Sequence, residues 1–291
     1  MEGYDLNTGI FGNNLRDVDG KFRLFVEELL ARKSIDVLFN DEIYTDSLNM
    51  DAYKNNLDFV ICIGGDGTFL NVARRVYLYD IPILGINYGS LGFLTNVERD
   101  DTENAIDRIL NGDYKLETRM MLDGSVLRNG EIIYSDTALN DIVIKNDVNS
   151  KIIHVKTYYD NLLIDNYPGD GLIVCTPTGS TAYSLSAGGP IVEPHTGQIT
   201  ITPICPHILF ARSFVTSGER IIRAVIDEVE DYECVLKFDD KGTIKLYGQD
   251  EITFRKSKSD VKIISINQIN FFDVLRKKLY NRGESLRKNE G

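Results

Sequence analysis

The stretch that most limits how this 291-residue chain can fold is Leu57–Ile63, a nearly continuous apolar run that ends abruptly at Gly64-Gly65. A strand that is apolar on both sides is typical of a parallel sheet covered on both faces. A second buried strand is predicted at Ile81–Ile86, and between the two we predict a helix over Thr68–Tyr79 with Thr68 as its N-cap. Alternating strands and helices of this kind indicate a parallel α/β sheet.

The neighbouring segments continue this alternation. Apolar residues at helical spacing between Phe22 and Leu30 predict an amphipathic helix. The further elements predicted here are strands at Asn7–Phe11 and Ile35–Phe39 and helices at Lys21–Arg32 and Thr102–Leu110.

From Tyr114 to Ile266 the pattern changes to strands separated by turns, and helical spacing returns in Gln268–Tyr280. We therefore predict two domains. The first is an α/β domain with a parallel sheet over residues 1–120, on which residues 268–291 pack back. The second, over residues 121–267, is a β-rich, sandwich-like domain.

The composition narrows the class of protein. The chain is 43% hydrophobic and 26% charged, as globular proteins are, and its net charge of −12 argues against a broad nucleic-acid footprint or an anionic membrane surface. No stretch approaches the roughly 20 apolar residues of a membrane span, and the N-terminus lacks the blocks of a signal peptide. The four cysteines form no CxxC pair, and no Cys or His spacing indicates a metal site. We expect a cytoplasmic protein with reduced thiols.

Gly64-Gly65-Asp66-Gly67-Thr68, here called the glycine loop, lies between a buried strand and a helix. Glycines let a phosphate approach the main chain, and a helix N-terminus adds unpaired amides and a favourable dipole. The loop matches neither a Walker A motif nor the GxGxxG of a Rossmann cofactor site. A carboxylate beside a phosphate is costly unless it binds Mg²⁺ or takes a proton from an attacking hydroxyl.

Asp66 is therefore either a functional residue or a helix-capping turn residue, and its position at the carboxyl end of a strand favours function. Arg74 follows two turns into the helix. It is either a phosphate ligand or an ordinary solvated surface arginine.

A second motif, Gly169–Pro190, is here called the hydroxyl-rich block. A buried strand, Leu172–Cys175, leads into a rigid turn at Pro177 and a run of small hydroxylated residues. A short helix near Thr181–Leu185 then carries an aromatic ring, Tyr183. Several hydrogen-bonding groups and one ring around a small volume suit a polar, planar ligand such as a nucleotide.

Taken together, these motifs resemble the ATP-NAD kinases in order and spacing. The resemblance runs from about residue 57 to 266. The glycine loop alone is shared with diacylglycerol-type lipid kinases and phosphofructokinases, whereas the hydroxyl-rich block is highly specific. The matching segments are the glycine loop, Gly89–Phe93, Asn140-Asp141, Asp170-Gly171, Thr176–Tyr183 and Thr202–His207.

The resemblance implies phosphorylation of the adenosine ribose 2′-hydroxyl of NAD by ATP with Mg²⁺ or another divalent cation, giving NADP. It implies that Asp66 orients or deprotonates that hydroxyl. The phosphate-binding residues expected are Gly64, Gly65, Gly67, Thr68 and Arg74. The NAD-binding residues expected are Asp66, Gly67, Phe93, Asn140, Asp141, Asp170, Thr178, Thr181, Ala182, Tyr183 and Ser186. ATP is expected on the first domain and NAD on the second.

The chain departs from the family pattern at Pro168, near which a basic residue is common, and after His207, where only Arg212 of the usual run is present. Two alternatives stay open at this point. One is a lipid or sugar kinase with the same glycine loop, and the other is an NAD-binding sensor that has lost its chemistry. The resemblance also implies a homodimer or homotetramer.

Overall fold

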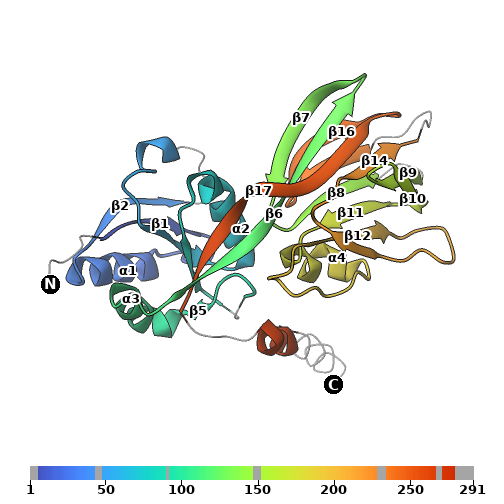
Figure 1. Ribbon diagram of the computed structural model, residues 1–291. Helices are drawn as coiled ribbons and strands as arrows, with labels where there is room; N and C mark the ends of the chain where they lie inside the picture. The colour runs from blue at the N-terminus through green and yellow to red at the C-terminus, as the bar shows by residue number, and fades with distance from the viewer. Residues whose placement is uncertain are drawn as a thin grey trace. The chain divides into compact units, whose positions relative to one another are not determined.

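The computed structural model describes residues 6–42, 48–89, 92–146, 152–227, 234–266 and 271–278 (Figure 1). Contacts divide the chain into two compact units. Unit 1 is Met1–Thr118 with Val261–Gly291, and unit 2 is Arg119–Asp260. The predicted parallel α/β sheet lies in the first and the predicted β-rich sandwich in the second, so the fold class is confirmed. Among the described residues, no helix has both the length and the apolar character needed to cross a membrane.

Unit 1 is built on parallel strands in the order β2-β1-β3-β4, and β5 pairs with β4. Residues of α1 and α3 share one core cluster with alternate residues of these strands, and α2 lies on the opposite face (Figure 1). The elements are β1 (Leu6–Gly12), α1 (Lys21–Arg32), β2 (Ile35–Glu42), η1 (Met50–Ala52), β3 (Phe59–Gly64), α2 (Asp66–Val76), η2 (Tyr77–Tyr79), β4 (Ile83–Asn87), β5 (Val97–Glu98), η3 (Arg99–Asp101), α3 (Thr102–Leu110) and a helix over residues 271–278.

Every residue of β3 and β4 is buried, as expected for strands covered on both faces. One prediction in this unit was wrong. Helix α2 begins at Asp66 with Gly65 as its N-cap, two residues before the expected start at Thr68. Thr68 lies in the first turn instead, where its hydroxyl accepts a hydrogen bond from the Asn13 side chain at 3.0 Å. Residues 271–278 of the predicted helix Gln268–Tyr280 are helical. Its other residues, 268–270 and 279–280, lie outside the described residues.

Unit 2 packs two antiparallel sheets face to face around one core cluster to which both sheets contribute. One sheet has the order β13-β12-β11-β8-β15-β16, and the other contains β10-β9-β14-β17 with the β6–β7 hairpin. The strands are β6 (Lys115–Arg128), β7 (Glu131–Ala138), β8 (Asp141–Asn146), β9 (Ile153–Tyr159), β10 (Leu162–Gly169), β11 (Gly171–Cys175), β12 (Gln198–Ile204), β13 (Phe214–Ser217), β14 (Ile222–Ile226), β15 (Cys234–Phe238), β16 (Lys241–Leu246) and β17 (Glu251–Ser265).

The short helix predicted near Thr181–Leu185 is two pieces, η4 (Thr178–Thr181) and α4 (Tyr183–Ser186). They are separated at Ala182, whose φ of −98° and ψ of −126° are not helical. Ala187, directly after α4, packs against an apolar cluster that includes Val143 and Ile173 on the six-stranded sheet. The hydroxyl-rich block therefore lies over the face of this sheet that is turned away from the main core.

An aspartate at the β15–β16 turn holds the turn that precedes β8. The Asp239 carboxylate accepts hydrogen bonds from the backbone N–H groups of Leu139, Asn140 and Asp141, at 2.7, 2.7 and 3.1 Å. Asp141 itself is only 5% exposed. Burial, together with the nearby negative charges of Asp239 and Asp240, raises the pKa of the Asp141 carboxyl to about 7.

Replacing Asp141 with Asn should change how stability depends on pH. Asp141 binds its proton up to about pH 7 in the folded chain, against 3.8 for an ordinary carboxyl, so the folded chain holds more protons between these values. Stability from this group is present at low pH and is lost as the pH rises. From pH 5 to pH 8 we expect the wild-type chain to lose on the order of 2 kcal/mol of unfolding free energy more than Asp141→Asn.

Urea unfolding of ligand-free protein at both pH values measures this difference. Asp113→Asn, at an exposed carboxylate, is the matched control and should follow the wild type. Equal losses in the wild type and in Asp141→Asn would show that Asp141 is ionised at pH 5.

Candidate active site

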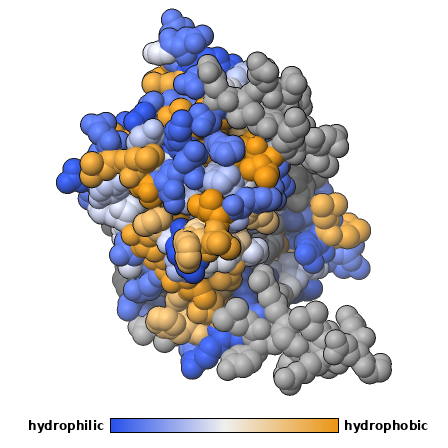
Figure 2. Space-filling view, turned by 90° about the vertical axis from the view of Figure 1, so that its right-hand side faces the viewer, coloured by the Kyte–Doolittle hydropathy of each residue, from blue (hydrophilic) through white to orange (hydrophobic). Residues whose placement is uncertain are grey.

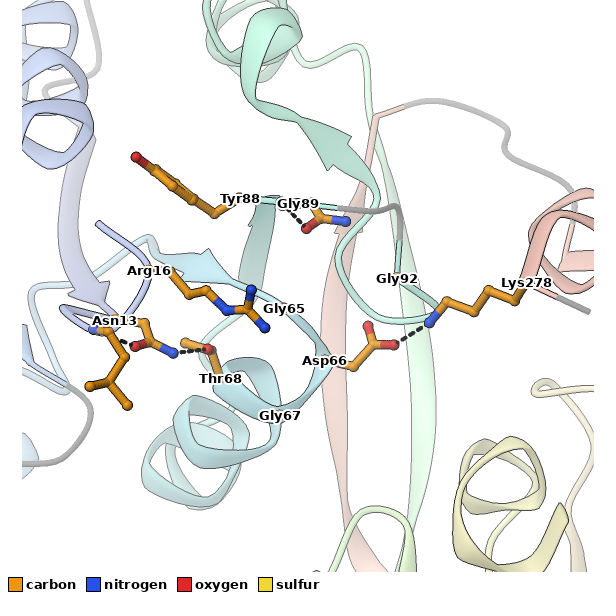
Figure 3. A pocket seen from close by; sticks show the side chains of 12 residues that line it. Asn13, Arg16, Gly65, Asp66, Gly67, Thr68, Tyr88, Gly89, Gly92 and Lys278 are labelled. Atoms are coloured by element: carbon orange, nitrogen blue, oxygen red, sulfur yellow. Dashed lines mark hydrogen bonds and ion pairs between the residues drawn. The ribbon is translucent and has the colours of Figure 1, made fainter. Parts of the chain in front are cut away.

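A pocket of about 450 Å³ lies over the glycine loop at the carboxyl ends of the unit 1 strands (Figure 3). Its size is in the usual range of small-molecule sites, and its place is the edge at which open α/β sheets bind ligands. It is lined by Asn13, Leu15, Arg16, Gly65, Asp66, Gly67, Thr68, Asn87, Tyr88, Gly89, Gly92 and Lys278.

The Asp66 carboxylate is held by backbone amides of the segment that follows Gly92. Oδ2 accepts a hydrogen bond from the Phe93 N–H at 3.1 Å, and Oδ1 accepts one from the Leu94 N–H at 3.0 Å. Lys278 Nζ lies 2.8 Å from Oδ2. Asp66 makes no side-chain cap to its own helix, whose N-cap is Gly65. The carboxylate therefore joins the glycine loop to the next loop of the sheet edge and lines the pocket.

Glycines keep the surroundings of Asp66 compact on one side and open on the other. A Cβ on Gly92 would lie 2.0 Å from Asp66 Oδ1, so only glycine allows this approach. A Cβ on Gly65 or Gly67 would meet no atom within 4 Å. The backbone at these two positions faces free space, and the first N–H groups of α2 have no partner within the helix. An oxyanion can therefore approach this helix end closely.

The cation that lines this pocket on the N-terminal side is Arg16, which the sequence analysis missed. It follows Asn13, whose side chain accepts from the Leu15 N–H at 3.0 Å and donates to Thr68 Oγ1 at 3.0 Å. Arg74, the cation expected there, is not among the residues that line the pocket. Arg16 could have been predicted from its position just after the first strand, at the edge where such sheets bind ligands. It was missed because the pattern of that strand is weak in the sequence.

Phe93 lies under the helix formed by residues 271–278. Its ring packs against the Phe271 ring with a centroid distance of 5.8 Å, and Lys278 Nζ lies 4.4 Å from the Phe93 ring centroid. Lys278 was also missed, because a lysine near the end of a polar tail carries no local sequence signal. The structure thus brings Gly64, Gly65, Asp66, Gly67, Thr68 and Phe93 together in unit 1.

Apart from Arg74 on α2, the other predicted residues lie in unit 2. The turn that starts the Thr176–Tyr183 segment packs on the turn before β8: Thr176 Oγ1 donates to the Leu139 carbonyl at 2.6 Å, and its N–H donates to the Asn140 carbonyl at 2.9 Å. A Cβ on Gly179 would lie 2.1 Å from the Asn140 carbonyl oxygen, so glycine is required there. Thr178 Oγ1 is buried, and no partner for it is present in the described part of the chain.

Tyr183 is 38% exposed on α4. Burial raises the pKa of its hydroxyl, with further contributions from Cys205, Asp170 and Asp141. Asp141 pairs with Cys175 at one end of β11, whereas Asp170 precedes the other end. Five residues of extended strand separate Asp170 from Cys175, which is roughly 16 Å. Thr181 and Ala182, which follow β11 in the sequence, are partly buried, and Ser186 is exposed.

The chain matches the ATP-NAD kinase N-terminal domain over residues 18–114 and the ATP-NAD kinase C-terminal domain over residues 139–266. It is 42% identical to the NAD kinase of Acetivibrio thermocellus over 97% of this chain and 100% of that protein. It is 51% identical to the NAD kinase of Ruminiclostridium cellulolyticum over 79% of this chain and 80% of that protein.

Solved structures share the fold. An NAD kinase from Archaeoglobus fulgidus in complex with ATP superposes with a TM-score of 0.74 at 26% identity, covering 94% of this chain and 99% of that one. Yeast NADH kinase complexed with NADH superposes with a TM-score of 0.78 at 22% identity, covering 94% and 87%. On these matches across both units, the chain belongs to the ATP-NAD kinase family.

Proposed function

We propose that this chain transfers the terminal phosphoryl group of ATP to the adenosine ribose 2′-hydroxyl of NAD, giving NADP and ADP. Phosphorylation of NAD with ATP is the activity of the family to which the chain belongs. The observation that carries the proposal for the reacting site is the Asp66 carboxylate, which lines a pocket beside an open helix N-terminus.

In this proposal Asp66 accepts the proton of the 2′-hydroxyl. The hydroxyl oxygen then forms its bond to the γ-phosphorus while the bond from that phosphorus to the ADP oxygen breaks. Gly65, Gly67 and Thr68 present backbone amides to the phosphates, and Arg16 adds a positive charge. Phosphoryl transfer depends mainly on such positioning and charge neutralisation.

Mg²⁺ fits this pocket as a companion of the triphosphate. Within the described residues there is no group of three or more His, Cys, Asp or Glu side chains that could hold a metal. Mg²⁺ usually keeps several waters and is bound largely through substrate phosphates, so the ion would enter this pocket on the triphosphate while Asp66 keeps its role as base. When bound, the ion would neutralise charge on the triphosphate.

We place NAD on the second domain, residues 121–267, and ATP on the first, residues 1–120 with 268–291. Asn140 and Asp141 would hold the adenosine part. The remaining residues proposed to line the dinucleotide are Asp170, Thr178, Thr181, Ala182, Tyr183 and Ser186. Two features support this assignment: Thr178 offers a buried hydroxyl for a ligand, and the proposed contacts run along the length of β11, as a long ligand requires.

The alternatives raised by the glycine loop are not favoured. A lipid kinase needs an apolar acceptor cleft, whereas the hydroxyl-rich block offers threonine and serine hydroxyls. The family match spans both units. A sensor without chemistry would have no need for a carboxylate held at the phosphate pocket by two amides.

Wild-type protein incubated with NAD, ATP and Mg²⁺ should form NADP, which an NADP-specific dehydrogenase quantifies. Asp66→Asn keeps the size of the side chain and removes the base, so kcat should fall by roughly 10²–10⁴. Saturable NAD binding by the variant is the control for folding. Near-normal turnover in Asp66→Asn would refute the base role, and a chelator should stop the reaction if the metal assignment holds.

The two arginines can be separated by matched substitutions. Arg16→Ala should raise the KM for ATP by about tenfold, the cost of losing one charge-assisted contact, while Arg74→Ala should have a smaller effect. Initial rates at varied ATP and saturating NAD measure both. If Arg74→Ala raises the KM for ATP more than Arg16→Ala does, the phosphate contact is made by Arg74 on α2 instead.

We also propose a cytoplasmic homo-oligomer, a dimer or tetramer. Cys62, Cys175 and Cys234 are buried free thiols, which suits a reducing compartment. Figure 2 shows hydrophobic residues gathered on one face of the molecule. On the edge strand β13 and the loop before it, Phe210 is 85% exposed and Phe214 is 43% exposed. Exposed apolar residues of this kind mark association surfaces.

Gel filtration at assay concentration should therefore show an oligomer that Phe210→Ser shifts towards the monomer. Leu24→Ser, at an exposed leucine on α1, is the matched control and should leave elution unchanged. A wild-type protein that elutes as a fully active monomer would contradict the assembly.

A further inference from the structure

Lys278 makes a set of contacts that an ordinary surface lysine does not make. Its ammonium lies 2.8 Å from Asp66 Oδ2 (Figure 3). It also lies 4.4 Å from the centroid of the Phe93 ring. The side chains of Lys278 and Asp66 are 30% and 29% exposed, so about two-thirds of each is shielded from water. Fully exposed ion pairs contribute little, whereas partly desolvated pairs are screened less.

The helix of residues 271–278 is positioned to deliver this lysine. Phe271, Val274 and Lys278 follow i, i+3 and i+7 spacing and so share one face. Phe271 packs on the Phe93 ring, and Val274 is only 6% exposed. Lys278 is thus the polar residue on this packed face of the helix. Phe93 contacts the face at both ends, through Phe271 and through Lys278.

Phe93 connects the lysine and the carboxylate in a second way. Its backbone N–H donates to Asp66 Oδ2, the oxygen that the ammonium also contacts, while its ring lies beneath the ammonium. The two amides of Phe93 and Leu94 fix the orientation of the carboxylate. Lys278 is the one contact in this group that brings a full positive charge, and its ammonium attracts the carboxylate oxygen from 2.8 Å in a partly desolvated setting.

We propose that Lys278 is a positioning residue for phosphoryl transfer, which holds the Asp66 carboxylate in one orientation in the pocket until the acceptor hydroxyl arrives. The inference rests on the base role proposed for Asp66. It assigns a function to the C-terminal helix, which neither the glycine loop nor the hydroxyl-rich block requires.

The test compares Lys278→Met, which keeps the side-chain length and removes the charge, with Lys278→Arg, which keeps the charge. In Lys278→Met, kcat should fall by about 10- to 100-fold with little change in the KM for ATP or NAD. Lys278→Arg should restore most of kcat.

The other charged and polar groups of the pocket do not differ between these variants. Arg16 and Tyr88 line the same pocket and are present in every variant. Lys277→Met, at the exposed neighbouring lysine on the same helix, is the matched control and should match the wild type.

A second measurement separates an effect through Asp66 from a loss of structure. If Lys278 acts on Asp66, then Lys278→Met should cause little further loss of kcat in the Asp66→Asn background. Additive losses, an effect confined to the KM for ATP or an increase in kcat would each overturn the proposal. If the wild-type protein forms no NADP, the proposed function fails. If it is active and Lys278→Met equals it, this inference alone fails.

Discussion

The candidate site in unit 1 is organised by one carboxylate that accepts hydrogen bonds from two successive backbone N–H groups. Asp66 lies at the start of α2, and its carboxylate accepts hydrogen bonds from the N–H groups of Phe93 and Leu94 in the loop beyond β4. Hydrogen bonds to an ionised acceptor are among the strong ones, and two in succession fix both position and direction. Gly92 allows the close approach. Together with the Tyr88 N–H, which donates to the Gly64 carbonyl at 3.3 Å, this contact fixes the glycine loop against the neighbouring loop.

The same device recurs in unit 2. Asp239 accepts three successive amides from Leu139 to Asp141 and so fixes the turn from which β8 begins. In both units an aspartate distant in sequence holds a short loop through its backbone, which leaves the loop's own side chains available for a ligand. This arrangement places the buried Asp141 carboxyl close to Asp239 and Asp240. The pKa of Asp141 is therefore raised to about 7.

The predictable parts of the structure were those with a local cause. Continuous apolar runs identified β3 and β4, and helical spacing identified α1 and α3 with the correct bounds. The start of α2 was missed because a threonine was taken as the cap, whereas the backbone at Gly65 makes the turn and the Thr68 hydroxyl is used by Asn13. The motifs of the glycine loop and the hydroxyl-rich block were readable for the same reason, since glycines and hydroxyls at fixed spacing have few other uses.

The sequence by itself determined the two-part architecture, the family and the segments proposed to carry the chemistry, because each depends on residues close together in the chain. Only the tertiary structure decided which charges share the pocket with Asp66. Arg16 and Lys278 line its pocket, while Arg74, eight residues from Asp66, does not. Ion pairs, cation–ring contacts and the burial that shifts the Asp141 pKa depend on distance and solvent exclusion. Those quantities exist only once segments from both ends of the chain are brought together.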